Sequence, residues 1–234
     1  EKKQEGEWAK NLQKLRVQCD KCVTFKPGSL IHPKEILDEL NSILKEDDIV
    51  VTGVGQHQMF AMHYLKISKT RKWISSGGAG TMGFCLPAAI GAKIARPTDN
   101  VFALDGDGSF QMTMQELGTI AQEGIKITPI IFNNNYLGMV RQWLEIFYNK
   151  RYSQVHLGEG PDFVKLAESY KLKGISISKK SEIRGAIEEA LKSDKTMIIE
   201  AKIEKESNVL PMLSPGGNLK DAFGGCMKKP GEFF

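Results

Sequence analysis

The sequence lacks the features that mark several special classes of protein. No apolar run approaches the ~20 residues that a membrane-spanning helix needs, and the first residues hold no apolar segment typical of a signal peptide. The 32 basic and 28 acidic residues are spread along the chain, so the net charge of +4 does not indicate nucleic acid or a membrane surface as a partner. We therefore expect a globular protein that binds neither.

Cysteine is also scarce, with four residues in the chain: Cys19, Cys22, Cys85 and Cys226. Cys19 and Cys22 have the spacing of a metal-binding knuckle, yet no second close pair of Cys or His completes a tetrahedral site. We interpret these two as reduced thiols near a linker. Reduced thiols favour a cytoplasmic location.

The 234 residues suffice for one large domain with its own core. Residues 1–30 carry apolar side chains at helical spacing, among them Trp8 and Leu12, and end in a loop signal. We interpret 1–30 as an inter-domain linker or the tail of a preceding domain, since the chain also lacks an initiator Met. Residues 31–205 form the expected main domain, and 206–234, rich in Pro and Gly at its start, an irregular C-terminal arm.

The main domain alternates between apolar runs and helical stretches. The apolar runs, typical of buried strands, are 49–52, 73–74, 101–104, 127–132, 175–177 and 197–203. The helical stretches are 33–44, 56–65, 82–95, 113–123, 137–148, 163–170 and 182–191. Strands that are apolar throughout and alternate with helices indicate a parallel sheet covered on both faces. We predict an α/β protein with three α/β/α layers and a mainly parallel sheet of about six strands.

One acidic residue follows a predicted strand between two glycines. Asp107 lies between Gly106 and Gly108, three residues after the end of the run 101–104. Ligands of open parallel sheets bind beyond the carboxyl ends of the strands, and glycines allow the backbone to approach a ligand closely. A carboxylate in this position offers the hard oxygen that Mg2+ prefers.

The next predicted strand ends in an asparagine cluster, 133–135. The helix before it spans roughly 17 Å and the strand roughly 20 Å, so these amides are expected level with Asp107. The helix that begins near Leu137 would turn its free N–H groups toward the same edge, where they favour a phosphate. Each motif alone is more typical of an ordinary turn. Together they predict a magnesium ion that joins a diphosphate to the sheet edge.

These two motifs resemble the thiamine diphosphate motif, in which Gly-Asp-Gly is followed by Asn-Asn, here 26 residues after Asp107. The flanking segments resemble the acetolactate synthase family, and they are 53–59, 76–83, 86–92 and 137–143. The resemblance covers about residues 30–217, and its most reaction-specific part is 138–143. Family members differ widely at Tyr136-Leu137, a variation that a backbone contact tolerates. The resemblance implies the C-terminal thiamine diphosphate-binding domain of a catalytic large subunit.

The resemblance also implies a role for individual residues. Asp107 and Asn134 would bind Mg2+ through their side chains and Tyr136 through its backbone carbonyl. Met82 would lie under the cofactor and hold its two rings in a bent shape, for which an adaptable thioether is suited. The cofactor contacts that it implies are Val54, Gly55, Gln56, His57, Gly80, Met82, Gly106, Asp107, Gly108, Ser109, Asn134, Tyr136, Leu137, Gly138 and Met139.

Further residues resemble pocket and phosphate contacts of the family. Val54, Met139 and Trp143 would shape the apolar substrate pocket, and Met139 and Trp143 could meet at one wall because they lie four apart on a helix. His57 and Ser109 would donate to phosphate oxygens, with Gln56 and Gln58 nearby. Any of these could instead be ordinary core residues. Arg141 and Lys150-Arg151 are interpreted as a solvated or subunit-facing surface.

The implied reaction joins two 2-oxo acids. Pyruvate loses CO2, and its remaining two-carbon unit is added to a second pyruvate or to 2-oxobutyrate, giving 2-acetolactate or 2-aceto-2-hydroxybutyrate for branched-chain amino acid biosynthesis. The family's active site lies between two copies of the catalytic subunit, and a regulatory small subunit is a further partner. FAD is expected in the full-length enzyme, mostly bound outside this chain. A glutamate of the absent N-terminal domain is also needed, so the chain alone is expected to be inactive.

Two alternatives stay open. The chain could belong to another thiamine diphosphate enzyme, namely a pyruvate oxidase, a glyoxylate carboligase or a 2-oxo acid decarboxylase, although Trp143 and the segment 53–59 weigh against this. It could also be a stand-alone cofactor-binding subunit, or only a folded domain. A gene that continues upstream with a glutamate-bearing domain would exclude the second alternative.

Overall fold

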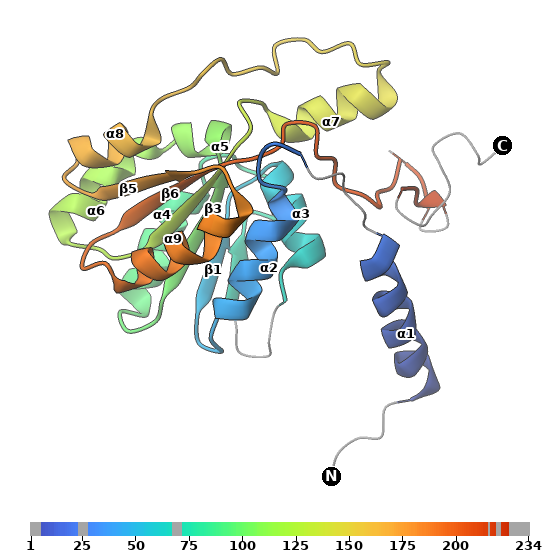
Figure 1. Cartoon of the computed structure of the whole chain (residues 1–234), viewed down its shortest axis with the longest axis horizontal. Coiled ribbons are helices and arrows are strands. Elements are labelled where there is room, and N and C mark those ends of the chain that lie inside the picture. Colours follow the sequence, from blue (N-terminus) through green and yellow to red (C-terminus); the bar gives the residue numbers. More distant parts are fainter. Residues whose placement is uncertain (1–5, 23–27, 67–71, 215, 219–220, 225–234) are drawn as a thin grey trace. The chain divides into compact units, whose positions relative to one another are not determined.

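The computed structural model describes residues 6–22, 28–66, 72–214, 216–218 and 221–224. The chain divides into two compact units, of which the larger is Gly28–Ser207 and the smaller combines Glu1–Pro27 with Asn208–Phe234. Figure 1 labels the helices and strands, and each unit is described by itself.

A six-stranded sheet forms the centre of the larger unit, and its strands follow the order β2-β1-β3-β4-β6-β5. The strands are β1 (Ile49–Thr52), β2 (Lys72–Ser75), β3 (Val101–Gly106), β4 (Thr128–Asn133), β5 (Lys173–Ile177) and β6 (Met197–Lys202). Every pair of neighbouring strands is parallel. All residues of β1, β3 and β4 are buried, as expected for strands covered on both faces. The predicted parallel sheet of about six strands is confirmed.

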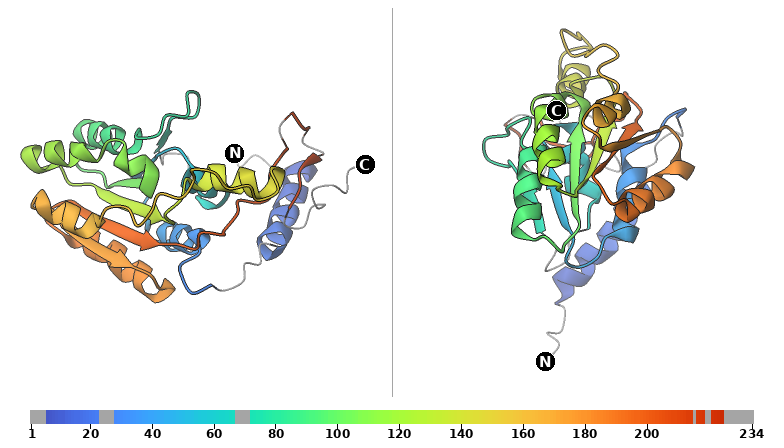
Figure 2. Two further views of the ribbon diagram at one scale, coloured as in Figure 1. Left: turned by 90° about the horizontal axis from the view of Figure 1, so that it is seen from above. Right: turned by 90° about the vertical axis from the view of Figure 1, so that its left-hand side faces the viewer.

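Helices cover both faces of this sheet, as the view along it in Figure 2 shows. The helices of this unit are α2 (Pro33–Ile43), α3 (Gln56–Tyr64), α4 (Cys85–Ala95), α5 (Asp107–Gln111), the 3-10 helix η1 (Met114–Glu116), α6 (Leu117–Glu123), α7 (Gly138–Phe147), α8 (Phe163–Ser169) and α9 (Lys180–Lys192). Helices α4, α6 and α8 contribute to one buried apolar cluster together with strand residues, whereas α2 packs against α3 and α9. The predicted three-layer arrangement is therefore present.

Local signals explain where α2 begins. His32 accepts the backbone N–H of Lys34 through Nδ1 (3.1 Å), and the Glu35 carboxylate accepts the N–H of His32 (3.0 Å). This reciprocal capping, with Pro33 in the first turn, satisfies helix-end donors that would otherwise lack partners. The apolar side chains Ile36, Leu37 and Leu40 of this helix are buried.

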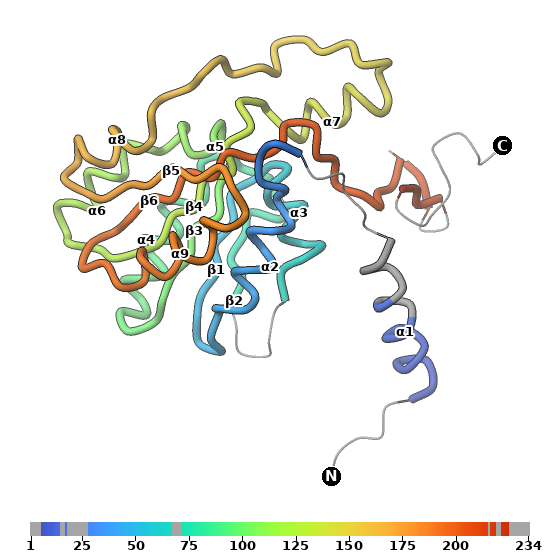
Figure 3. Tube along the Cα trace, in the orientation of Figure 1, coloured from blue at the N-terminus to red at the C-terminus, as the bar shows by residue number. Residues whose placement is uncertain are grey.

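Two helix boundaries differ from those that the sequence predicts. The chain becomes helical at Asp107 rather than near Thr113, and it reaches Glu123 through a 3-10 turn. Figure 3 traces the course of the chain, with α5 and α6 labelled. Met82 lies in the turn before α4 rather than inside a helix that begins there. The prediction failed at both places because glycines surround these residues, and glycine disfavours helices unless tertiary contacts hold them.

The smaller unit contains α1 (Glu7–Cys22), where the sequence shows helical spacing. Its side chains Trp8 and Leu12 are 76% and 43% exposed, and a short bridge pairs Met212 with Phe223 in the C-terminal segment. The cysteine side chains at 19, 22 and 226 lie outside the described part of the structure. Across the described residues, every helix falls short of the length and apolarity needed to cross a membrane.

Candidate functional site

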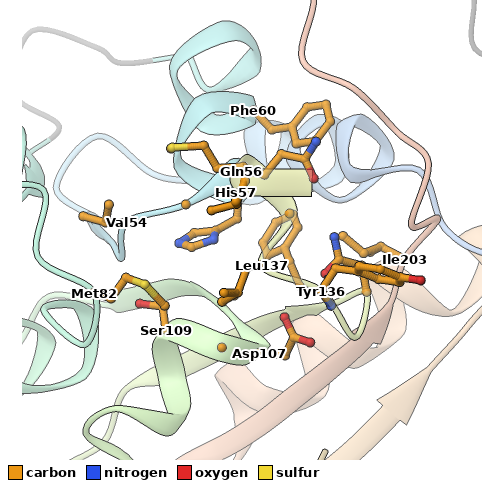
Figure 4. A pocket seen from close by; sticks show the side chains of 18 of the residues that line it. Val54, Gln56, His57, Phe60, Met82, Asp107, Ser109, Tyr136, Leu137 and Ile203 are labelled. Carbon is orange, nitrogen blue, oxygen red and sulfur yellow. Dashed lines mark hydrogen bonds between the residues drawn. The ribbon is translucent and has the colours of Figure 1, made fainter. Parts of the chain in front are cut away.

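A cavity of about 260 Å³ opens at the carboxyl ends of the central strands. All the cofactor contacts that the sequence predicts line it, and they are residues 54–57, 80, 82, 106–109, 134 and 136–139. Phe60, Phe132, Val140 and Ile203 also line the cavity. The sequence reasoning missed these four, which lie beside the predicted motifs or at the end of an apolar run. Figure 4 shows the side chains around this space.

Asp107 begins α5 directly at the end of β3 and is 4% exposed. The register pairs Gly106 with Phe132, so β3 and β4 end level with one another, as their predicted lengths require. Burial raises the pKa of Asp107 to about 7, whereas backbone N–H groups of Gly108 and Asn135 that donate to its carboxylate oppose the rise, and nearby Glu200 adds to it.

Glu200 is a second buried carboxylate at this edge, 7% exposed on β6. Its Oε1 accepts from Nδ2 of Asn133 (2.7 Å), and Oδ1 of Asn133 accepts the N–H of Asn135 (3.1 Å). Within the described part of the chain, neither Glu200 nor Asp107 forms an ion pair with a basic side chain. Two buried acids beside amide oxygens therefore fit a divalent cation. The sequence reasoning missed Glu200, although a charge within the apolar run 197–203 was a signal.

Asn134 and Tyr136 follow β4 at the same edge. Oδ1 of Asn134 accepts the N–H of Tyr136 (3.0 Å), and Tyr136 forms an isolated antiparallel bridge with His156. Hydrogen bonds from residues on either side flank this bridge, so the N–H and C=O of Tyr136 point away from His156. They lie on the side of Asn134. The structure thus brings the three predicted metal ligands to one sheet edge.

Met82 is held in place through the glycine that follows it. Gly83 donates its N–H to Oγ of Ser109 (3.0 Å) and accepts from Oγ1 of Thr113 (2.8 Å). Its φ of +84° lies in the left-handed region, which glycine adopts without strain. In Figure 4 the Met82 side chain lies beside Ser109 and opposite Leu137. The turn before α4 therefore fixes Met82 as one wall of the cavity.

His57 and Asp105 form a buried pair beside the cavity, and both are nearly inaccessible to solvent. His57 Nε2 lies 3.4 Å from Oδ1 of Asp105. Burial lowers the pKa of His57 to about 3, although the Gly53 carbonyl opposes this, and burial raises the pKa of Asp105 to about 7. Ser109 donates its hydroxyl proton to Asp105. His57 and Ser109 thus line the cavity, with the Ser109 proton directed to Asp105 rather than into the open space.

The first turn of α7 approaches the cavity closely. A Cβ on Gly138 would lie 2.5 Å from Oε1 of Gln56 and 2.9 Å from Nδ2 of Asn134, so any larger residue would force these side chains to shift. No side chain caps this helix start at Leu137. Residues 137–140 line the cavity. The amide groups of a helix N-terminus are therefore placed beside the acidic sheet edge, where they favour an anion.

Trp143 is a predicted pocket residue that does not line the cavity. Its ring packs on Phe147 with the ring centroids 5.1 Å apart. Met139 lines the cavity from the first turn of α7, whereas Trp143 lies roughly 6 Å further along the axis. Met139 and Trp143 lie on one face of α7 because they are four residues apart. Only the start of this helix reaches the cavity, so Met139 lines it and Trp143 does not.

Two further side chains differ from their predicted surroundings. Gln58 donates Nε2 to Oγ of Ser75 (2.7 Å), which directs it toward β2 rather than the cavity. Arg141 was expected on a solvated or subunit-facing surface, yet it is 3% exposed and pairs with Glu145. That expectation was wrong because α7 turns polar residues inward. Lys150 and Arg151 are exposed, as predicted.

The fold and the cavity define an α/β domain that binds its ligand at the carboxyl ends of parallel strands. Residues 53–201 match the family described as "Thiamine pyrophosphate enzyme, C-terminal TPP binding domain". The chain belongs to this family.

The chain is also similar to acetolactate synthase large subunits. An acetolactate synthase large subunit of Cyanidium caldarium is 40% identical over 217 residues, which cover 92% of this chain and 37% of that protein. A probable acetolactate synthase large subunit of Methanocaldococcus jannaschii is 48% identical over 79% of this chain and 31% of its own length. The chain therefore spans about a third of the length of these relatives.

A solved structure shows the same fold. The thiamine diphosphate-dependent 4-hydroxybenzoylformate decarboxylase of Rhodococcus jostii RHA1 superposes with a TM-score of 0.70 and 27% identity. The match covers 77% of this chain and 34% of that one.

Proposed function

We propose that this chain is the cofactor-binding C-terminal part of an acetolactate synthase. It would condense two pyruvates, or pyruvate and 2-oxobutyrate, with release of CO2. The observation that carries this proposal is that one cavity contains every predicted cofactor contact. The identity of 40% and 48% to acetolactate synthase large subunits supports the choice of reaction.

The proposed cofactor site combines a metal edge with a helix start. The side chains of Asp107 and Asn134 and the carbonyl of Tyr136 would hold Mg2+, and the first turn of α7 would bind the diphosphate. The acidic edge supports this assignment, because buried Asp107 and Glu200 need a cation nearby. Thiamine diphosphate, when bound, supplies the carbon nucleophile that attacks a 2-oxo acid and the electron sink that permits loss of CO2.

The chain's own residues would position the reactants and exclude water. Met82, fixed through Gly83, would support the bent cofactor from one side of the cavity. Val54, Leu137 and Met139 would form apolar walls that keep water from the reacting carbon. Gly138 would let the α7 backbone approach the diphosphate.

We further propose that the complete active site needs segments outside this chain. A glutamate from the N-terminal domain of a second catalytic subunit, FAD bound mostly elsewhere, and a regulatory small subunit belong to this proposal. The isolated chain would then bind thiamine diphosphate but not turn over pyruvate. Turnover of pyruvate by the 234-residue chain alone would contradict this part.

Calorimetric titration of the chain with thiamine diphosphate, with and without Mg2+, tests the site. Binding that depends on Mg2+ and is lost in Asp107→Ala is the expected result. Assay of the full-length enzyme with pyruvate tests the reaction, for which acetolactate is expected. The similarity to the 4-hydroxybenzoylformate decarboxylase makes an aldehyde the main competing product, and acetyl phosphate would indicate an oxidase instead.

A further inference from the structure

Helix α7 is attached to the domain in an unusual way. Its only buried residues are Arg141 and Gln142, which are both polar. Its apolar side chains are partly buried at best, and Val140 is 47% exposed. Arg141 pairs with Glu145 of the same helix. A helix that lacks a buried apolar stripe needs polar contacts to fix it to the rest of the domain.

Gln142 provides such a contact and is fully buried, at 0% exposed. Its Oε1 accepts from Nε2 of Gln56 (2.8 Å), and the same Nε2 donates to the carbonyl of Ser207 (2.7 Å). A carbonyl can only accept, so the Ser207 bond fixes which end of the Gln56 amide is nitrogen. The Gln142 end that faces Gln56 must then be the oxygen. The orientation of both amides is thus determined by the network.

Gln56 meets α7 at a second point one turn earlier. Its Oε1 lies where a Cβ on Gly138 would be only 2.5 Å away. Gly138 and Gln142 are four residues apart and therefore lie on the same face of the helix. Two contacts on one face, both made by Gln56, fix the rotation of α7 about its own axis.

We propose that Gln142 is a positioning residue that sets, through Gln56, the rotation of α7 and so selects which side chains form the apolar wall of the cavity. Gln142 does not line the cavity, whereas Gln56, Met139 and Val140 do. A rotation by one residue would turn Met139 roughly 100° away from its present direction. The effect on cofactor binding rests on the proposed function, but the setting of the helix does not.

The test uses Gln142→Met, which keeps the length of the side chain but removes the acceptor. One buried N–H of Gln56 would then lack its acceptor. The lost hydrogen bond should make local opening of α7 roughly tenfold more frequent. Hydrogen–deuterium exchange of the ligand-free chain should show about tenfold faster exchange in residues 138–147 and at the start of α3. Exchange in β3 and β4 should be unchanged.

Two variants serve as controls. Gln122→Met makes the same chemical change at an exposed position of α6, away from the site. This variant should leave hydrogen exchange in α7 unaltered. The double variant Gln56→Met/Gln142→Met should exchange in α7 no faster than Gln142→Met, because the two amides act through each other. Unchanged exchange in α7 of Gln142→Met, or equally faster exchange throughout the sheet, would overturn the proposal.

Titration with thiamine diphosphate and Mg2+ then separates this proposal from the proposed function. If the wild-type chain binds the cofactor, Gln142→Met should bind it several-fold more weakly, and equal affinity would contradict the link to the cavity. If the wild-type chain does not bind, the proposed function is in doubt, while the exchange result still decides whether Gln142 positions α7.

Discussion

Nε2 of His57 and Oδ1 of Asp105 lie 3.4 Å apart, and both side chains are almost fully buried next to the cavity. Burial favours the neutral form of each group, so it lowers the pKa of the imidazole to about 3 and raises that of the carboxyl to about 7. The pair therefore carries little net charge beside the place where an anionic cofactor is proposed.

The raised pKa of Asp105 predicts a pH dependence of stability. The carboxyl is protonated in the folded state but ionised in the unfolded chain between about pH 4 and pH 7, so folding takes up a proton. The contribution of the Asp105 carboxyl to the free energy of unfolding is complete below pH 4 and is lost as pH rises through 7. Asp105→Asn should therefore lose less free energy of unfolding than wild type between pH 5 and pH 8 in urea denaturation. Asp47→Asn, at an exposed position, should behave as wild type. The prediction would be refuted if the free energy of unfolding of Asp105→Asn fell with pH as steeply as that of wild type.

Asp107→Asn should abolish metal-dependent cofactor binding without unfolding the domain. The amide keeps the size of the side chain but removes a charged ligand, so the loss should exceed the roughly 10–100-fold typical of changes around a metal site. Removing a buried carboxylate should leave the free energy of unfolding at pH 8 equal or higher. Asp162→Asn, at the exposed start of α8, is the matched control and should bind as wild type. Unaltered Mg2+ dependence in Asp107→Asn would count against the metal assignment.

Gly138→Ala and Gly185→Ala should have opposite effects. A Cβ at Gly138 would collide with the amides of Gln56 and Asn134, whereas nothing lies within 4 Å of a Cβ at Gly185 in α9. We expect Gly138→Ala to cost about 1–3 kcal/mol of stability and to weaken cofactor binding. Gly185→Ala should gain about 0.5–1 kcal/mol, since alanine favours helices. Thermal and chemical denaturation of both variants measure this, and a stabilised Gly138→Ala would contradict the close approach of α7.

Ser109→Ala should destabilise the domain through the turn that holds Met82. The variant loses the acceptor for the buried N–H of Gly83 and a donor to Asp105, at a cost of about 1–3 kcal/mol. Ser169→Ala removes an exposed hydroxyl that donates to a backbone carbonyl and should change stability by less than about 0.5 kcal/mol. Urea denaturation compares the two; similar small losses would show that Ser109 does not hold the turn.

The sheet and the placement of Asp107 and Asn134 at one of its edges were predictable because they depend on local patterns. Fully apolar runs such as 101–104 and 127–132 indicate buried parallel strands, and matched element lengths place Asp107 and Asn134 at the same edge. Both inferences need only the sequence periods of helices and strands. The fold and the placement of Asp107 and Asn134 follow from them, whereas the other cofactor contacts were implied by the resemblance to a known family.

Other features depend on tertiary contacts that no local pattern reports. Asp105 looked like the end of an apolar strand, and its pairing with His57 requires β3 and α3 to be adjacent. Trp143 shares a helix face with Met139, but the sequence does not tell how far the cavity extends along α7. Arg141 was expected at the surface, but the usual rule of apolar residues inward is reversed in α7, whose buried residues are Arg141 and Gln142.

The strand order has a consequence for the synthesis of the protein. Strand β6 lies between β4 and β5 in the sheet, although β5 precedes it in the chain. On the ribosome, β5 therefore has no neighbour in the sheet until residues 197–202 emerge, whereas Asp107 and Asn134 can already approach one another on paired β3 and β4. A nascent or truncated chain that stops before Met197 would expose the open edge of β4, which favours aggregation. Shortened forms made to study the cofactor site must extend beyond Lys202.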